Sequence, residues 1–214
     1  MSSHAQDLAA HEGGHESIWS GGGSPYAIGS NKLGMWLFIV SDAITFSALL
    51  VAYSYVRTST EAWPRPFESA SVINATVMTL VLLTSSVTMV LGVRAAKMGI
   101  RSRAAGWLVA TLMGGVTFDV LHLREWFGLF HQGVTPWGNP WGTPLFGATF
   151  FGLTGLHMTH VTIGVVYLAV VAFGTARGKY NDEVVEVAGL YWHFVDLVWM
   201  FIFPLVYLLS ARIG

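Results

Sequence analysis

The sequence has no cysteine and few charged side chains. Among its 214 residues, Asp, Glu, Lys and Arg together make up only 11%. The absence of cysteine excludes disulfides, thiolate metal sites and thiol catalysis. Soluble domains carry about 25% charged residues, whereas this chain is 53% hydrophobic, so its composition predicts a membrane protein. A net charge of -1 provides no field that would attract nucleic acid.

The first residues of the chain also lack the features of a secretory signal peptide. Residues 1–31 contain neither a basic segment nor an apolar core that could act as one. We expect this part to be a polar, flexible amino-terminal tail. Residues 32–214 then form the membrane domain.

Long apolar runs dominate the rest of the chain, and each exceeds the ~20 residues that cross ~30 Å of hydrocarbon as a helix. They predict an all-α bundle of five transmembrane helices, with the two termini on opposite sides of the membrane. The runs cover approximately residues 33–56, 72–95, 104–127, 145–175 and 187–211.

The basic residues of the loops predict the orientation. Seven lie on the side of the amino terminus and four on the other side, so the positive-inside rule places the amino terminus in the cytoplasm and the carboxyl terminus outside. The seven are Lys32, Arg94, Lys97, Arg101, Arg103, Arg177 and Lys179, and the four are Arg57, Arg65, Arg124 and Arg212.

The last apolar run carries two ionisable residues, His193 and Asp196. An Asp at mid-membrane costs about 3 kcal/mol on insertion scales. His193 and Asp196 are three residues apart and share a helix face, which Trp192 and Trp199 extend. We therefore expect this face to contact protein and not lipid.

Two of the other runs carry acids. Asp42 lies near the middle of the first run without a partner on its own helix, so we expect a neutral carboxyl group there. Asp119, His122 and Glu125 are spaced by three in the third run and form one stripe. A hydrogen-bonded network against another helix is favoured for this stripe over a proton or ion relay.

The second and fourth runs carry polar residues without acids. The second is rich in Ser and Thr, whose hydroxyls are expected to bond to their own helix and to allow close packing. In the fourth run, His157 and His160 lie three apart, but a metal site would need further ligands, and structural histidines are favoured. Gly152, Gly155 and Gly164 are expected to let neighbouring helices approach closely.

Three classes of function remain open at this point. A di-haem cytochrome would use His122, His157, His160 and His193 as axial ligands, although His157 and His160 lie too close to bind stacked haems. A channel or transporter is disfavoured because the chain shows no inverted repeat or broken-helix pair. The third class is a non-catalytic bundle subunit of a larger membrane enzyme.

Four segments of the chain resemble one family. Residues 191–199, Tyr-Trp-His-Phe-Val-Asp-Leu-Val-Trp, resemble the signature of subunit III of the haem–copper oxidases. Residues 154–164, with His157 and His160, are similar to its second signature, and residues 34–42 to its first-helix motif, with Asp42 in place of the usual Glu. Residues 118–126 resemble a fourth pattern, in which His122 replaces Gln and Trp126 replaces Tyr, and Glu186 also matches.

The resemblance implies the five-helix bacterial form of a seven-helix family, in a multi-pass protein of the bacterial plasma membrane. Such a subunit binds no haem or copper and is not catalytic by itself. It flanks subunit I, which holds haem and copper, reduces dioxygen to water and pumps protons, and it supports sustained proton uptake. Subunit II, small subunits or a respiratory supercomplex, and phospholipids, are the further partners that the family implies.

The resemblance also implies roles for single residues. Asp42 is expected to support proton uptake. The remaining positions are expected to form a polar network between helices or to bind lipid headgroups: Asp119, His122, Glu125, His157, His160, Glu186, His193 and Asp196. An accessory protein of a nitric oxide reductase is the alternative within the fold. The electron donor, cytochrome c or quinol, stays open.

Overall fold

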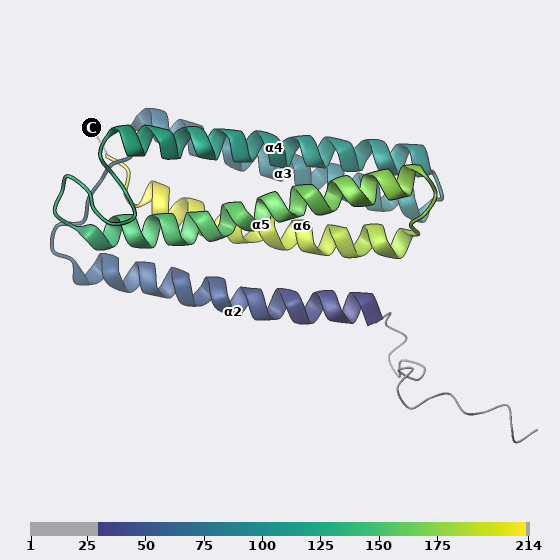
Figure 1. Ribbon diagram of the computed structural model, residues 1–214, viewed down its shortest axis with the longest axis horizontal. Coiled ribbons are helices and arrows are strands. Elements are labelled where there is room, and N and C mark those ends of the chain that lie inside the picture. The colour runs from purple at the N-terminus through teal and green to yellow at the C-terminus, as the bar shows by residue number, and fades with distance from the viewer. Residues whose placement is uncertain (1–29, 213–214) are drawn as a thin grey trace, which may run out of the picture.

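A computed structural model describes residues 30–212, and within this range all the regular elements are helices. Five of them are long and apolar enough to cross a membrane, as predicted (Figure 1). The first four helices begin and end slightly outside the predicted runs. The last begins before its predicted run, and its α-helical part ends before that run does. They are α2 (Ser30–Ser59), α3 (Ser69–Lys97), α4 (Arg101–His131), α5 (Pro144–Ala176) and α6 (Asp182–Ile202), which continues as the π-helix η1 (Phe203–Leu208).

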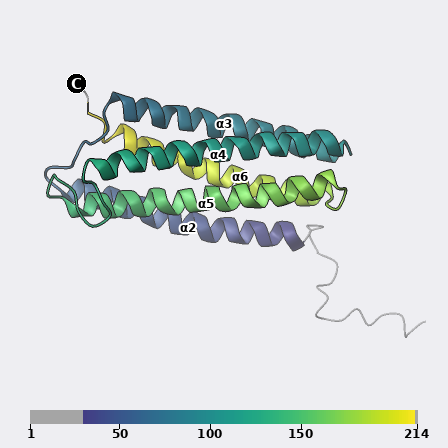
Figure 2. The ribbon, with the colours of Figure 1, turned by 45° about the horizontal axis from the view of Figure 1, so that its top comes forward.

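The helices run side by side, and α6 lies at the centre of the bundle. It packs against α2, α3 and α5 (Figure 2). α4 packs between α3 and α5, on the side of the bundle away from α2. In the most apolar stretch of α6, 56% of the residues are buried. In the corresponding stretch of α2, only 11% are buried. The residues predicted to form the protein-facing side of the last run therefore belong to the central helix, and α2 is the most exposed helix.

Local sequence explains how several of the helices end. Gly99 and Gly178 have φ angles of 74° and 70° and end α3 and α5 in the left-handed region that glycine favours. The Asn181 side chain caps α6 by accepting a hydrogen bond from the Val184 amide at 3.2 Å. Pro204 lies at the start of η1, where its missing N–H interrupts the regular ladder, so the α-helix ends at Ile202.

The core is built around Trp192 of α6. A Cβ atom at Gly115 of α4 would lie 2.5 Å from this indole, and one at Gly164 of α5 would lie 3.0 Å from it. The indole Nε1–H donates to the Ser85 hydroxyl of α3 at 3.0 Å. Trp192 thus contacts three neighbouring helices, and two of them can approach it only because glycine has no side chain.

The glycines of α5 differ in their surroundings. Gly164 packs against Trp192 and Gly155 faces Trp126, whose indole would lie 3.1 Å from an added Cβ, as predicted. Gly152 does not fit the prediction, because an added Cβ would meet no atom within 4 Å. Gly152 lies on the exposed side of α5, so its spacing from Gly155 does not place it at a helix contact.

The hydroxyls of α3 have two tasks. As predicted, they bond to carbonyl groups of their own helix, for example Thr79 to Ala75 at 2.9 Å. Thr79 also accepts the Trp199 Nε1–H at 2.9 Å, just as Ser85 accepts that of Trp192. Two buried indoles of α6 are therefore held by the hydroxyl groups of one neighbouring helix.

The carboxyl-terminal end ties α2 to the bundle. The Ser210 hydroxyl is fully buried and accepts hydrogen bonds from Arg57 at 2.7 Å and from the Trp63 indole at 3.3 Å. Because both of its lone pairs are then used, its proton points to Tyr53, whose hydroxyl lies 3.2 Å away. These contacts compensate for the small area that α2 buries along its length.

A substitution at Gly115 tests the packing around Trp192. Gly115→Ala places a methyl group 2.5 Å from Trp192 and 2.6 Å from Val165, so we expect the free energy of unfolding to fall by about 1–3 kcal/mol. Thermal unfolding of the purified protein in detergent measures the change. Gly106→Ala in the same helix, where no atom lies within 4 Å, is the control and should stabilise by up to ~1 kcal/mol. Equal melting temperatures for the two variants would contradict this account.

Candidate functional site

Asp42 of α2 has its partner on another helix. The Nε2 atom of His160 in α5 lies 2.7 Å from the Asp42 Oδ2 atom. The N–H direction is not that of an aligned hydrogen bond, and the contact is an ion pair only when His160 is protonated. Both side chains are partly open to the bundle surface, with exposed fractions of 18% for Asp42 and 13% for His160.

The second ring nitrogen of His160 decides how many protons this pair holds. The Nδ1 atom lies 2.8 Å from the Leu156 carbonyl oxygen, which can only accept, so Nδ1 carries a proton. The contact between Nε2 and Oδ2 offers two sites for one further proton, Nε2 of His160 and the Asp42 carboxyl group. The arrangement can hold and transfer a single proton at the middle of a membrane helix.

Glu186 lies near one end of the bundle, at the start of α6. Its carboxylate pairs with Lys32 of α2 at 2.6 Å and with Lys97 of α3 at 3.1 Å. Lys97 is more than half exposed, so this pair is well solvated and has a modest energy. The three residues connect the start of α6 to the helices on either side of it.

His193 and Asp196 lie where α6 meets α3. The His193 Nδ1 atom lies 2.6 Å from the Ser86 hydroxyl, and Ser86 also lies within reach of Asp196. Asp196 is 7% exposed, and its Oδ1 atom has no hydrogen-bond partner within residues 30–212. His193 is half-buried, so the pair reaches the surface of the bundle between α3 and α6.

The three residues of the α4 stripe lie in three different surroundings. Asp119 accepts a hydrogen bond from Thr162 of α5 at 3.0 Å, and Glu125 accepts one from Asn74 of α3 at 3.1 Å. His122 points between them into the fully buried core. Residues spaced by three lie along one side of a helix. That side of α4 is wide enough to contact both α3 and α5, so the members of the stripe have different neighbours.

His122 and His157 occupy an aromatic cluster in the core. Both side chains are fully buried, and none of their four ring nitrogens has a hydrogen-bond partner within the described part of the chain. The His157 ring stacks on Trp199 with centroids 5.2 Å apart, and Phe118 lies edge-on to it at 5.6 Å. Aromatic rings thus take the place of polar partners around these two imidazoles.

The predicted polar residues therefore form several separate clusters and not one network. Asp42 meets His160, Glu186 meets two lysines, and His193 meets Ser86. Sequence reasoning missed the partners that are neutral or that lie near helix ends. Of these partners, only Lys32 and Lys97 could have been indicated by the sequence, because their positive charges complement the negative charge of Glu186. The partners missed are Lys32, Asn74, Ser86, Lys97 and Thr162.

The arrangement of the histidines bears on the haem alternative. The nitrogens of His160 lie against Leu156 and Asp42, and aromatic rings fill the space beside His157. Across residues 30–212, no group of three or more His, Cys, Asp or Glu side chains is placed to hold a metal ion. His160 thus pairs with α2, whereas His157 is packed among aromatic rings.

Comparisons with known proteins agree with this arrangement. A model of the family described as cytochrome c oxidase subunit III matches residues 11–211. The chain is 33% identical to cytochrome c oxidase subunit 3 of Alkalihalophilus pseudofirmus over 187 residues, which are 86% of this chain and 89% of that protein.

Quinol oxidases are among its relatives as well. Identity is 31% over 183 residues with quinol oxidase subunit 3 of Bacillus spizizenii, covering 84% of this chain and 87% of that protein. It is 29% over 205 residues with cytochrome bo(3) ubiquinol oxidase subunit 3 of Pseudomonas aeruginosa, covering 94% of each. The five helices, the signature residues on α2, α4, α5 and α6, and these matches show that the chain belongs to the cytochrome c oxidase subunit III family.

Proposed function

We propose that this chain stabilises the catalytic subunit of a haem–copper terminal oxidase and supports its sustained proton uptake. The contact between Asp42 and His160 carries the proposal, because it holds one proton at a site that is partly open to the surface of α2 and α5. A group of this kind can buffer protons beside an enzyme that consumes them. The chain itself takes no part in the redox chemistry.

The exposed surface of α2 supports a position against other components. Ile44, Val51 and Tyr55 are about two-thirds exposed, and along its length α2 contacts the bundle through α5 and α6. In hydrocarbon this surface needs lipid or apolar protein beside it. Subunit I is the partner we propose for the bundle, with subunit II and phospholipids further out, in the bacterial plasma membrane.

The haems and copper of the proposed complex belong to the partner subunits. The three relatives are all named as oxidase subunits, which favours an oxidase over a nitric oxide reductase. They include cytochrome c and quinol oxidases, so both donors fit the chain equally well. The orientation with the amino terminus in the cytoplasm places Lys97 and Glu186 on the cytoplasmic side.

A visible absorption spectrum tests whether this chain binds haem itself. The isolated chain, purified in detergent from cells that make haem, is expected to show no Soret band, because its histidines are engaged by Asp42, Ser86 and aromatic rings. A Soret band in stoichiometric amount would instead support the haem cytochrome. Subunit I purified in the same way is the positive control.

Substitution of Asp42 tests the proton-holding role. Asp42→Asn keeps the size of the side chain but removes its ability to exchange a proton with His160. We expect unchanged copurification with subunit I and an unchanged initial rate of oxygen consumption, with a severalfold faster loss of activity during turnover. Asp119→Asn, which replaces a half-buried acid bonded to Thr162, is the matched control and should retain wild-type turnover. Loss of copurification of the Asp42→Asn variant with subunit I would contradict the proposed proton-holding role.

Substitution of Asp196 tests the association with the partner. Its carboxyl group has an unpaired oxygen at the seam of α3 and α6, and Asp196→Ala removes the carboxylate beside the Ser86–His193 pair. We expect the variant to copurify poorly with subunit I in detergent. Asp196→Asn retains the hydrogen-bonding capacity and should copurify normally. Undiminished copurification of Asp196→Ala, with a normal melting temperature, would count against this role.

A further inference from the structure

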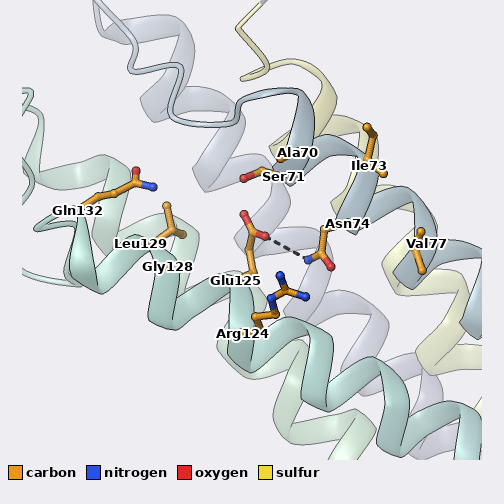
Figure 3. Close-up of a pocket in the computed structure, with 10 residues that line it drawn as sticks. All are labelled: Ala70, Ser71, Ile73, Asn74, Val77, Arg124, Glu125, Gly128, Leu129 and Gln132. Carbon is orange, nitrogen blue, oxygen red and sulfur yellow. Dashed lines mark hydrogen bonds between the residues drawn. The ribbon is translucent and has the colours of Figure 1, made fainter.

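A polar hollow lies between α3 and α4, at the end of the bundle where α3 begins. Its volume is about 410 Å³, and its lining includes Ser71, Asn74, Arg124, Glu125 and Gln132. Figure 3 shows the Arg124 and Glu125 side chains extending from α4 toward α3, where Asn74 donates to Glu125. None of the polar pairs that we place in the proton-holding site belongs to this hollow.

The hollow presents a positive and a negative group side by side. Asn74 occupies the Oε2 atom of Glu125, so the carboxylate keeps its other oxygen for a further donor. Arg124 is exposed and makes no hydrogen bond or ion pair with any other residue between 30 and 212. A ligand that fits both groups carries an anionic and a cationic group a few bonds apart.

The position along the membrane normal matches the level of lipid headgroups. With 31 residues, α4 is about 46 Å long, so roughly 8 Å extends beyond each side of ~30 Å of hydrocarbon. Arg124 lies seven residues before the end of α4, which is about 10 Å. Its guanidinium group therefore lies near the boundary between hydrocarbon and headgroups.

A second hollow continues the first toward the middle of the membrane. Val77 lines both, and the second, of about 280 Å³, extends along Leu80, Thr84 and Thr88 of α3 and past Gly114 of α4. Its lining is mostly apolar, because the hydroxyls of Thr84 and Thr88 bond to their own helix. From Val77 to Thr88 the groove is about 16 Å long, about half of the ~30 Å hydrocarbon thickness, which is one leaflet.

We propose that this groove, from Ser71 to Thr88 between α3 and α4, binds one phospholipid whose headgroup carries a phosphate and a primary ammonium group. Arg124 pairs with the phosphate, and the free oxygen of Glu125 accepts a hydrogen bond from the ammonium. A quaternary ammonium has no N–H to donate, and an anionic headgroup places no positive charge against Glu125. One acyl chain lies along the apolar part of the groove.

Lipid titration tests the proposal. The full-length protein, purified with the subunits that accompany it and stripped of lipid, is titrated in detergent with dioleoyl phosphatidylethanolamine, phosphatidylglycerol or phosphatidylcholine and followed by native mass spectrometry. We expect the ethanolamine lipid to bind most tightly. Glu125→Gln should weaken its binding about tenfold while leaving phosphatidylglycerol unaffected. Arg124→Gln should weaken all three lipids, because they share the phosphate.

Matched variants separate the groove from the fold. Gly128 lines the polar hollow and has no atom within 4 Å of an added Cβ, so Gly128→Leu fills the headgroup space without a clash at the Cβ position. It should weaken every lipid, whereas Gly152→Leu on α5, which is equally open, should weaken none. Arg103→Gln, at the other end of α4, is the control for charge.

Three results would overturn the proposal. The first is ethanolamine lipid binding no more tightly than phosphatidylcholine. The second is unchanged binding of the ethanolamine lipid to Glu125→Gln or Gly128→Leu. The third is binding of none of the three lipids, which would favour a segment of a partner protein in the groove. None of these measurements depends on oxidase activity, so the groove can fail while the proposed role of Asp42 stands.

Discussion

The hydrocarbon core of a membrane offers no hydrogen-bond partner, and this constraint organises the whole bundle. A buried polar group without a partner costs several kcal/mol, so most of them are satisfied by protein, while His122 and His157 lie among aromatic rings. The indoles of Trp192 and Trp199 show the solution clearly, because both donate to hydroxyls of α3. Those hydroxyls are available as acceptors since their own protons already point to carbonyl groups of α3.

The same constraint turns the ionisable residues into connections between helices. Asp42 and His160 join α2 to α5, Asp119 and Thr162 join α4 to α5, and Asn74 and Glu125 join α3 to α4. Each polar group that would be costly alone thus stabilises one helix contact. Only the first of these pairs combines a second ionisable group with partial access to the surface, and for that reason it is the pair that we propose as the proton-holding site.

Function in this protein follows from what the bundle leaves exposed. α2 exposes most of its apolar surface, and His193 reaches the seam between α3 and α6. The groove between α3 and α4 combines charges at headgroup level with an apolar path below them. A chain with such exposed surfaces, which suit lipid or other subunits, fits the supporting role that we propose for it.

The sequence by itself determined the five membrane-crossing helices and the protein-facing side of the last one. Runs of apolar residues set the length of a helix, and a spacing of three or four sets its faces, so both are local properties. The four signature segments likewise indicated the family from local patterns. The motif around His193 and Asp196 was sufficient to place α6 against protein, and the structure places it at the centre of the bundle.

Only the tertiary structure decided which helix each of those faces meets. Asp42 finds His160 and Glu186 finds Lys32 across separations of more than one hundred residues, and periodicity along one helix carries no information about its neighbours. The separation of Asp119, His122 and Glu125 among three surroundings, the burial of His122 beside His157, and the open surface at Gly152 have the same origin. They depend on the crossing and rotation of helices, which the packing of side chains such as Trp192 between Gly115 and Gly164 determines.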